Sequence, residues 1–122
     1  MEIIDAHAHI YPEKIAKKAT ETIGVFYDIE MEMPAGTPER LIEEGRGAGV
    51  SRFVVHSVAT TAHQVRSINE FLKRECEAHP EFIGFITLHQ ELPRKRFSPR
   101  WIGRCKTALR ASSFTPIFKN SI

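Results

Sequence analysis

Residues 2–10 of the chain are EIIDAHAHI, a short apolar run that leads into two histidines. We predict a first strand over residues 2–7. Side chains two positions apart on a strand project to the same side, so His7 and His9 can aim both imidazoles at one point. Such a pair can supply two nitrogens to a divalent metal ion. By itself the pair is a weak signal, and the alternative is two polar residues in a loop after a strand. Its place at the tip of the first strand favours the metal site.

The sequence that follows alternates between helix and strand patterns. Three helices are predicted: from Pro12 to Gly24, from Pro38 to a group of glycines at 45–49, and over 61–78. Thr37 is the predicted N-cap of the second helix. Two further strands are predicted over 53–55 and 82–88. This β-α-β-α-β order predicts an α/β fold with a parallel sheet. The sheet belongs either to a doubly wound fold or to the first part of a (β/α)8 barrel. Both place the functional site at the carboxyl ends of the strands.

Further polar side chains are predicted near those strand ends. Asp5 lies two residues before His7, on the same side of the predicted strand, and is a candidate to accept a hydrogen bond from a metal-binding histidine. His56 closes the second strand and His89 the third, so both are candidates to line a substrate pocket; the alternative for each is an ordinary packed histidine. His63 and His79 fall in a helix and at a helix end, where we expect a surface position.

Composition limits the class of protein. The chain has 122 residues, 42% of them apolar, and two cysteines, which is enough for one modest core and does not indicate a disulfide scaffold. Its apolar runs are shorter than the ~18 residues of a membrane span, and the first residues do not resemble a secretory signal. We therefore expect a cytoplasmic protein with no membrane partner.

Charge divides the chain into two parts. Residues 1–91 carry a net charge of −6, whereas residues 92–122 carry +8 and contain no acidic side chain. We predict one folded unit over 1–91 and a basic tail over 92–122 without a folding pattern. The alternative interpretation is a small βαβαβ binding module whose basic arm, with Trp101, Phe114 and Phe118, binds nucleic acid. Deletion of 92–122 would separate the two, because only the second predicts a loss of salt-sensitive nucleic-acid binding.

The first part of the chain resembles a known family. The segments IIDAHAHIYP (3–12), GAGV (47–50) and PEFIGF (80–85) are similar to the amidohydrolase superfamily, in particular to the amidohydrolase-related branch of aminocarboxymuconate-semialdehyde decarboxylase and its relatives. This resemblance implies a metal-dependent TIM barrel in which His7 and His9 are ligands. Zinc is the first expectation, with manganese or iron as alternatives, and the bound metal serves hydrolysis or decarboxylation of a small-molecule substrate.

The resemblance also implies ligands that these residues do not supply. The family adds a histidine after a middle strand and an aspartate after the last strand, and a barrel needs ~250 residues. No acidic residue follows Glu91. We therefore expect the N-terminal part of a barrel that binds metal weakly, is inactive alone and self-associates through its open edges, and no catalytic residue is assigned.

The tail itself is compatible with a shifted reading frame. One permitted coding string for residues 107–121, read from the third base of its first codon, encodes GLKGIKLHPDFQKF. That peptide is similar to the segment that follows the third strand and helix in the same branch of the family. We therefore prefer a frameshifted tail to a nucleic-acid-binding arm, and nucleic acid is not an expected partner.

Overall fold

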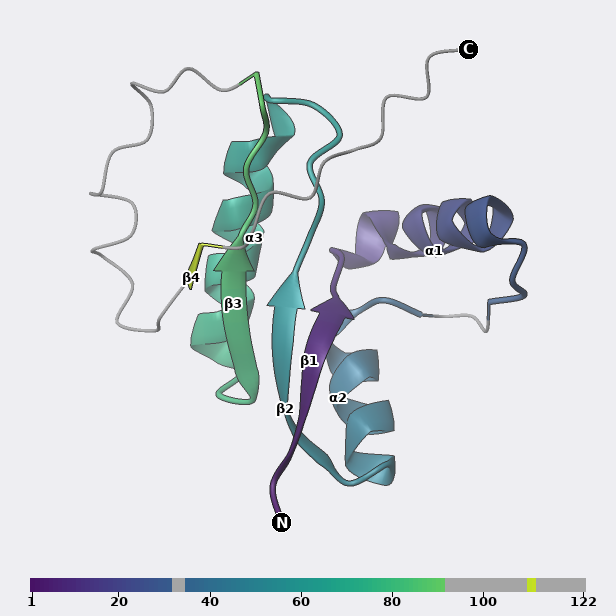
Figure 1. Cartoon of the computed structure of the whole chain (residues 1–122), viewed down its shortest axis with the longest axis vertical. Helices are drawn as coiled ribbons and strands as arrows, with labels where there is room; N and C mark the ends of the chain where they lie inside the picture. The colour runs from purple at the N-terminus through teal and green to yellow at the C-terminus, as the bar shows by residue number, and fades with distance from the viewer. Residues whose placement is uncertain (32–34, 92–109, 112–122) are drawn as a thin grey trace.

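The computed structural model describes residues 1–31, 35–91 and 110–111, the last two as backbone only (Figure 1). The elements in these ranges are β1 (Ile3–His9), α1 (Glu13–Tyr27), α2 (Pro38–Gly47), β2 (Val50–His56), α3 (Gln64–Ala78), β3 (Phe82–Ile86) and β4 (Arg110–Ala111). None of the helices in the described part of the chain is long and apolar enough to cross a membrane.

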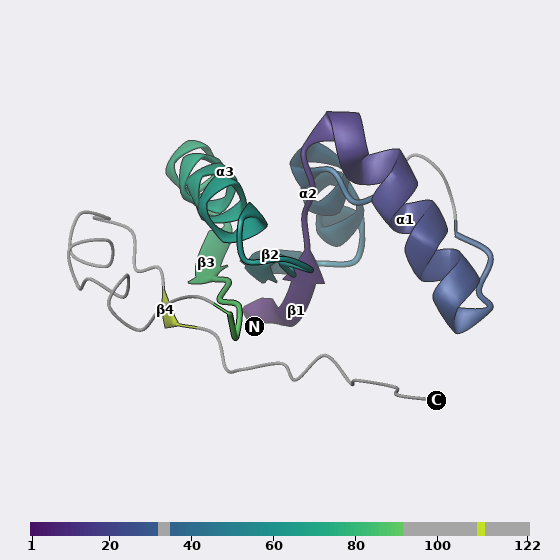
Figure 2. The same cartoon turned by 90° about the horizontal axis from the view of Figure 1, so that it is seen from above.

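The strands form one parallel sheet in the order β1-β2-β3-β4. This confirms the predicted α/β class and the parallel pairing. Figure 2 shows α2 and α3 on the same face of the sheet, while α1 extends away beyond β1. Because all strands run in the same direction, their carboxyl ends lie along one edge, which is where the candidate site lies.

The core lies between the sheet and the helices α2 and α3. Phe53 and Val55 of β2 project toward these helices and are almost completely buried, as are Leu72 of α3 and Phe82 of β3. The rings of Phe53 and Phe82 meet edge to face, with their centroids 6.0 Å apart. The alternate residue Val54 is only partly buried on the opposite face, as the period of a strand requires.

Helix α1 differs from its prediction at both ends. Pro12 is the N-cap and not the first helical residue, and the helix continues past Gly24 to Tyr27. Asp28 then ends it in a left-handed conformation (φ 54°) and donates its backbone N–H to the carbonyl of Gly24. Gly24 is buried, and a β-carbon there would meet the carbonyl oxygen of Ile29 at 2.9 Å. The glycine is therefore needed for a close chain approach and not for stopping the helix.

The buried face of α1 also differs from the prediction. The helical spacing of Ile15, Ala16, Ala19 and Ile23 predicts that this face of the helix is buried. Ile15 is instead half exposed, and Ala16, Thr20 and Gly24 form the buried stripe. The Thr20 hydroxyl donates to the carbonyl of Ala16 at 2.8 Å, so this polar side chain is satisfied where it is buried.

The predicted capping of α2 is confirmed. Pro38 is the first helical residue and the Thr37 hydroxyl accepts a hydrogen bond from the backbone N–H of Arg40 at 3.3 Å. The helix ends at Gly47, so Gly45 lies within it and does not help to end it. Gly49 follows with φ +80°, in the region that favours glycine.

Two other elements are shorter than predicted. Helix α3 begins at Gln64 and not at residue 61, because the Gln64 side chain accepts hydrogen bonds from the backbone N–H groups of Thr60 and Thr61 and so holds them in a turn. Strand β3 ends at Ile86 and not at residue 88, because the backbone N–H of Thr87 donates to the side chain of Asn69.

Most of the predicted tail (92–122) lies outside the described residues, and with it the predicted boundary after residue 91. The exception is β4, whose Arg110 and Ala111 pair in parallel with Phe85 and Ile86.

Candidate metal centre

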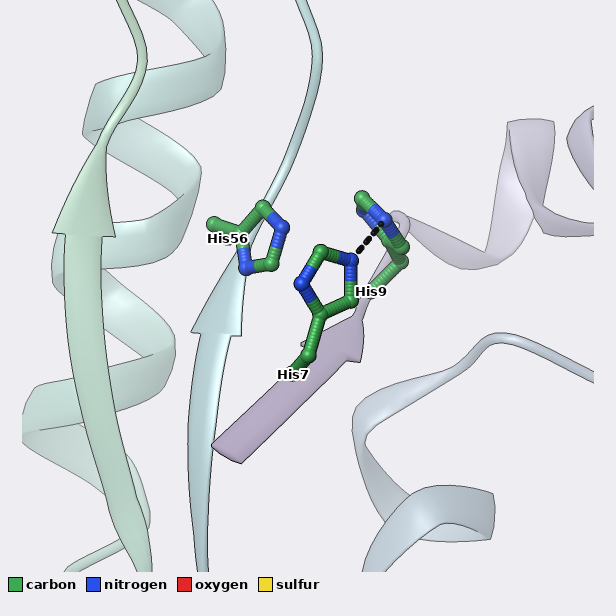
Figure 3. A group of neighbouring side chains, drawn as sticks. All are labelled: His7, His9 and His56. Atoms are coloured by element: carbon green, nitrogen blue, oxygen red, sulfur yellow. Dashed lines mark hydrogen bonds between the residues drawn. The ribbon is translucent and has the colours of Figure 1, made fainter. Parts of the chain in front are cut away.

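Three histidines meet at the carboxyl edge of the sheet. His7 and His9 come from the end of β1 and His56 from the end of β2, and one ring nitrogen from each lies within 4.8 Å of the others (Figure 3). The Nε2 atoms of His7 and His9 are 3.1 Å apart. The ring centroid of His56 lies 4.2 Å from that of His7 and 4.4 Å from that of His9. The predicted convergence of His7 and His9 is therefore present, and a third imidazole joins them.

The register of β1 on β2 brings these rings together. His9 pairs with His56 directly, as Ala8 does with Val55. Between Asp5 and Ala8 the register shifts, so that β1 has one residue more than β2 over this stretch. Within this irregular stretch the backbone N–H of His7 donates to Asp5 Oδ1 at 3.0 Å. Asp5 thus supports the backbone of His7, and it is not among the grouped ligand atoms.

Residues just beyond the two strands hold this edge in place. Ile10 is completely buried, and its carbonyl accepts a hydrogen bond from the buried hydroxyl of Ser57 at 3.2 Å, which ties the end of β1 to the end of β2. The backbone N–H of Tyr11 donates to the carbonyl of Gly36 at 2.8 Å, and the Tyr11 ring stacks on His9 at a centroid distance of 6.4 Å. These contacts leave His9 and His56 partly buried and His7 exposed.

The surroundings favour neutral imidazoles. Burial, followed by the nearby rings of His9 and His7, lowers the pKa of His56 to about 4. Burial and then His7 also lower the pKa of His9, and the backbone of His56 opposes this in part. Metal ligation requires the unprotonated ring, so at neutral pH these two residues are already in the binding form.

The spacing of one pair of nitrogens fits a divalent metal ion. Zinc binds imidazole nitrogens at 2.0–2.1 Å, which places two ligands of a tetrahedral site about 3.3 Å apart, close to the 3.1 Å between the hydrogen-bonded Nε2 atoms of His7 and His9. Nδ1 of His9 is buried and has no hydrogen-bond partner in the described part of the chain. It is the other nitrogen of that ring, so an ion held by Nε2 would leave it unpartnered.

The remaining predicted site residue lies apart from this cluster. His89 is mostly buried, three residues beyond β3, where its Nδ1 accepts a hydrogen bond from the backbone N–H of Glu91. Its predicted role in a pocket stays a prediction. His63 is exposed at the start of α3, as expected. The sequence predicted His56 as a pocket residue; what brings its ring to the histidine pair is its register position opposite His9.

Comparison of the chain with protein-family models, with curated proteins and with solved structures gives no match. The fold and the histidine cluster are therefore the basis for assigning a function.

Proposed function

We propose that this chain is the N-terminal part of a metal-dependent hydrolase or carboxy-lyase of the amidohydrolase kind, with His7 and His9 as ligands of a divalent metal. The observation that carries the proposal is the pair of Nε2 atoms 3.1 Å apart at the carboxyl end of a parallel strand. This is the edge where α/β enzymes hold their reacting groups.

The arrangement of the sheet is compatible with the start of a barrel. β1, β2 and β3 follow one another in chain order, and α2 and α3 cover the same face (Figure 2). The first three strands of a doubly wound sheet have the same order, so the choice of a barrel rests on the resemblance and not on the sheet. On the opposite face, which none of the helices in the described residues covers, Ile4 of β1 is 47% exposed and Val54 of β2 partly so. A complete barrel would enclose such apolar side chains in its interior.

Zinc is the metal that this donor set favours, since imidazole nitrogens suit Zn²⁺ and related ions better than they suit Mg²⁺ or Ca²⁺. A bound zinc ion would supply Lewis acidity, either to a water for hydrolysis or to a carboxylate substrate. The residues of the chain would bind the ion in their neutral form, with Asp5 fixing the backbone of His7. The later histidine and aspartate implied by the resemblance have no counterpart here, so turnover by these 122 residues alone is not proposed.

Metal binding tests the proposal. The chain and its His7→Ala and His9→Ala variants would be brought to equilibrium with the same free concentration of Zn²⁺ and analysed for bound metal. Both variants should bind much less zinc than the unchanged chain does, because each removes one nitrogen of the close pair. A His63→Ala variant, which changes an exposed histidine outside the cluster, is the matched control. Equal zinc in all four proteins would refute the proposal.

The relationship to the barrel family has a separate test in the coding DNA. An inserted or lost base between codons 92 and 96, followed by an open frame for well over a hundred codons, is the expected result. A verified gene without such a shift, and with no related frame downstream, would contradict the frameshift.

A further inference from the structure

We propose that His56 is a third metal ligand, so that residues 1–91 hold a three-histidine site by themselves. This inference rests on the proposed function, which needs only the β1 pair, and extends it to a ligand on β2. It replaces the expectation of weak binding through two histidines, since three protein ligands with one open position are typical of catalytic zinc sites.

The geometry requires little rearrangement. His56 lies opposite His9 in the register of the two strands, so its backbone position is set by the sheet and not by a mobile loop. Its ring stands almost perpendicular to that of His7 (86°), with the centroids 4.2 Å apart. The three ligand atoms lie within 4.8 Å of one another, and a tetrahedral site needs about 3.3 Å. Small rotations of the imidazoles about their side-chain bonds would close that difference.

The donor set predicts both the kind of metal and its accessibility. Three imidazoles bring no negative charge, and Asp5 is occupied with the backbone of His7. Such a site favours Zn²⁺, Co²⁺, Ni²⁺ and Cu²⁺ and binds Mg²⁺ and Ca²⁺ poorly, because the latter prefer oxygen ligands. His7 is the exposed member of the group. We therefore expect the fourth position to face solvent and to be filled by water.

Cobalt substitution gives a test that does not depend on activity. The full chain would be titrated with Co²⁺ while its visible absorption is recorded, and its affinity for Zn²⁺ would be measured by competition with a chelating dye. We expect one ion per chain and the intense bands of a four-coordinate site. Loss of a residue that only hydrogen-bonds to a metal ligand weakens metal binding about ten- to hundred-fold. His56→Ala and His56→Asn should each weaken zinc binding by more than this, because each removes a ligand. His63→Ala should leave both readouts unchanged.

A measurement on the unchanged chain gives a result that does not depend on whether the variants fold. Long-range ¹⁵N–¹H spectra of the histidine rings should show zinc-induced shifts of a ring nitrogen for His7, His9 and His56, and for no other histidine. If His7 and His9 shift but His56 does not, the third ligand is wrong and the proposed function stands. If none of the three shifts, or if no metal binds, both proposals fail.

Discussion

Gly45 of α2 lies directly against the ring of Phe53, in the middle of β2. A β-carbon at position 45 would overlap the ring atoms Cζ and Cε1 of Phe53, which is among the most buried side chains of the core. The absence of a side chain at this point therefore sets how closely α2 approaches the sheet. A glycine within a helix usually weakens it, and here close packing against the sheet compensates for that cost.

Replacing this glycine should destabilise the protein. Gly45→Ala gains up to about 1 kcal/mol of helix propensity but forces Phe53 or the helix to move, at a cost of about 1–3 kcal/mol. We expect a lower urea midpoint of unfolding. Gly47→Ala is the matched control, because a β-carbon there meets no atom within 4 Å, and it should be neutral or slightly stabilising. Equal midpoints for the two variants would contradict the packing argument.

Asn69 should be important for the end of β3. Its side chain accepts a hydrogen bond from the backbone N–H of Thr87 at 2.8 Å and donates one to the Thr87 carbonyl at 3.0 Å. Because Thr87 is buried, Asn69→Ala leaves its backbone groups without these partners, and we expect a loss of about 1–3 kcal/mol in the free energy of unfolding. Ser67→Ala, which removes an exposed hydroxyl of the same helix, should change it by less than about 0.5 kcal/mol. An equal change in the free energy of unfolding for both variants would contradict the prediction.

The ion pair between Arg46 and Glu81 predicts a pH dependence. A hydrogen bond from its own backbone, and then the guanidinium of Arg46 at 3.0 Å, lower the pKa of Glu81 below its usual 4.5. A carboxyl group with a lowered folded pKa stabilises the protein above its unfolded pKa, and this contribution is lost as pH falls through the folded value. Arg46→Gln should therefore raise the pKa of Glu81 in an NMR titration.

In the Arg46→Gln variant the pKa of Glu81 should stay below its usual value, because the hydrogen bond from the Glu81 backbone remains. Lys73→Gln, which removes the exposed partner of Glu77 on α3, should leave the pKa of Glu81 where it is. An unchanged Glu81 pKa in Arg46→Gln would show that the guanidinium has no influence on it.

Metal should stabilise the fold. An ion that binds only the folded chain raises the free energy of unfolding by about 2.7 kcal/mol at a free concentration a hundred times its dissociation constant. We therefore expect Zn²⁺ to raise the thermal midpoint and a chelator to reverse the effect. The His7→Ala variant should not respond to zinc, whereas His63→Ala should respond as the unchanged chain does. A zinc response that survives in His7→Ala would place the ion elsewhere.

Several features of the protein were determined by the local sequence. The alternation of apolar runs with helical patterns predicted the parallel α/β sheet, and the Thr37-Pro38 pair predicted the start of α2. The alternation of side chains along a strand placed His7 and His9 together. Each of these depends on residues close in the chain, whose geometry is fixed by the period of a strand or the first turn of a helix.

Other features depended on contacts between distant segments, and only the tertiary structure decided them. Gly24 was predicted to stop a helix, but the chain near Ile29 packs against it; β3 ends early because Asn69 of another element takes the next backbone N–H. His56 joins the histidine pair because of the register between β1 and β2. A sequence pattern predicts that two strands will pair, but their register follows from how both pack on the same core, and that register determines which side chains meet at the edge.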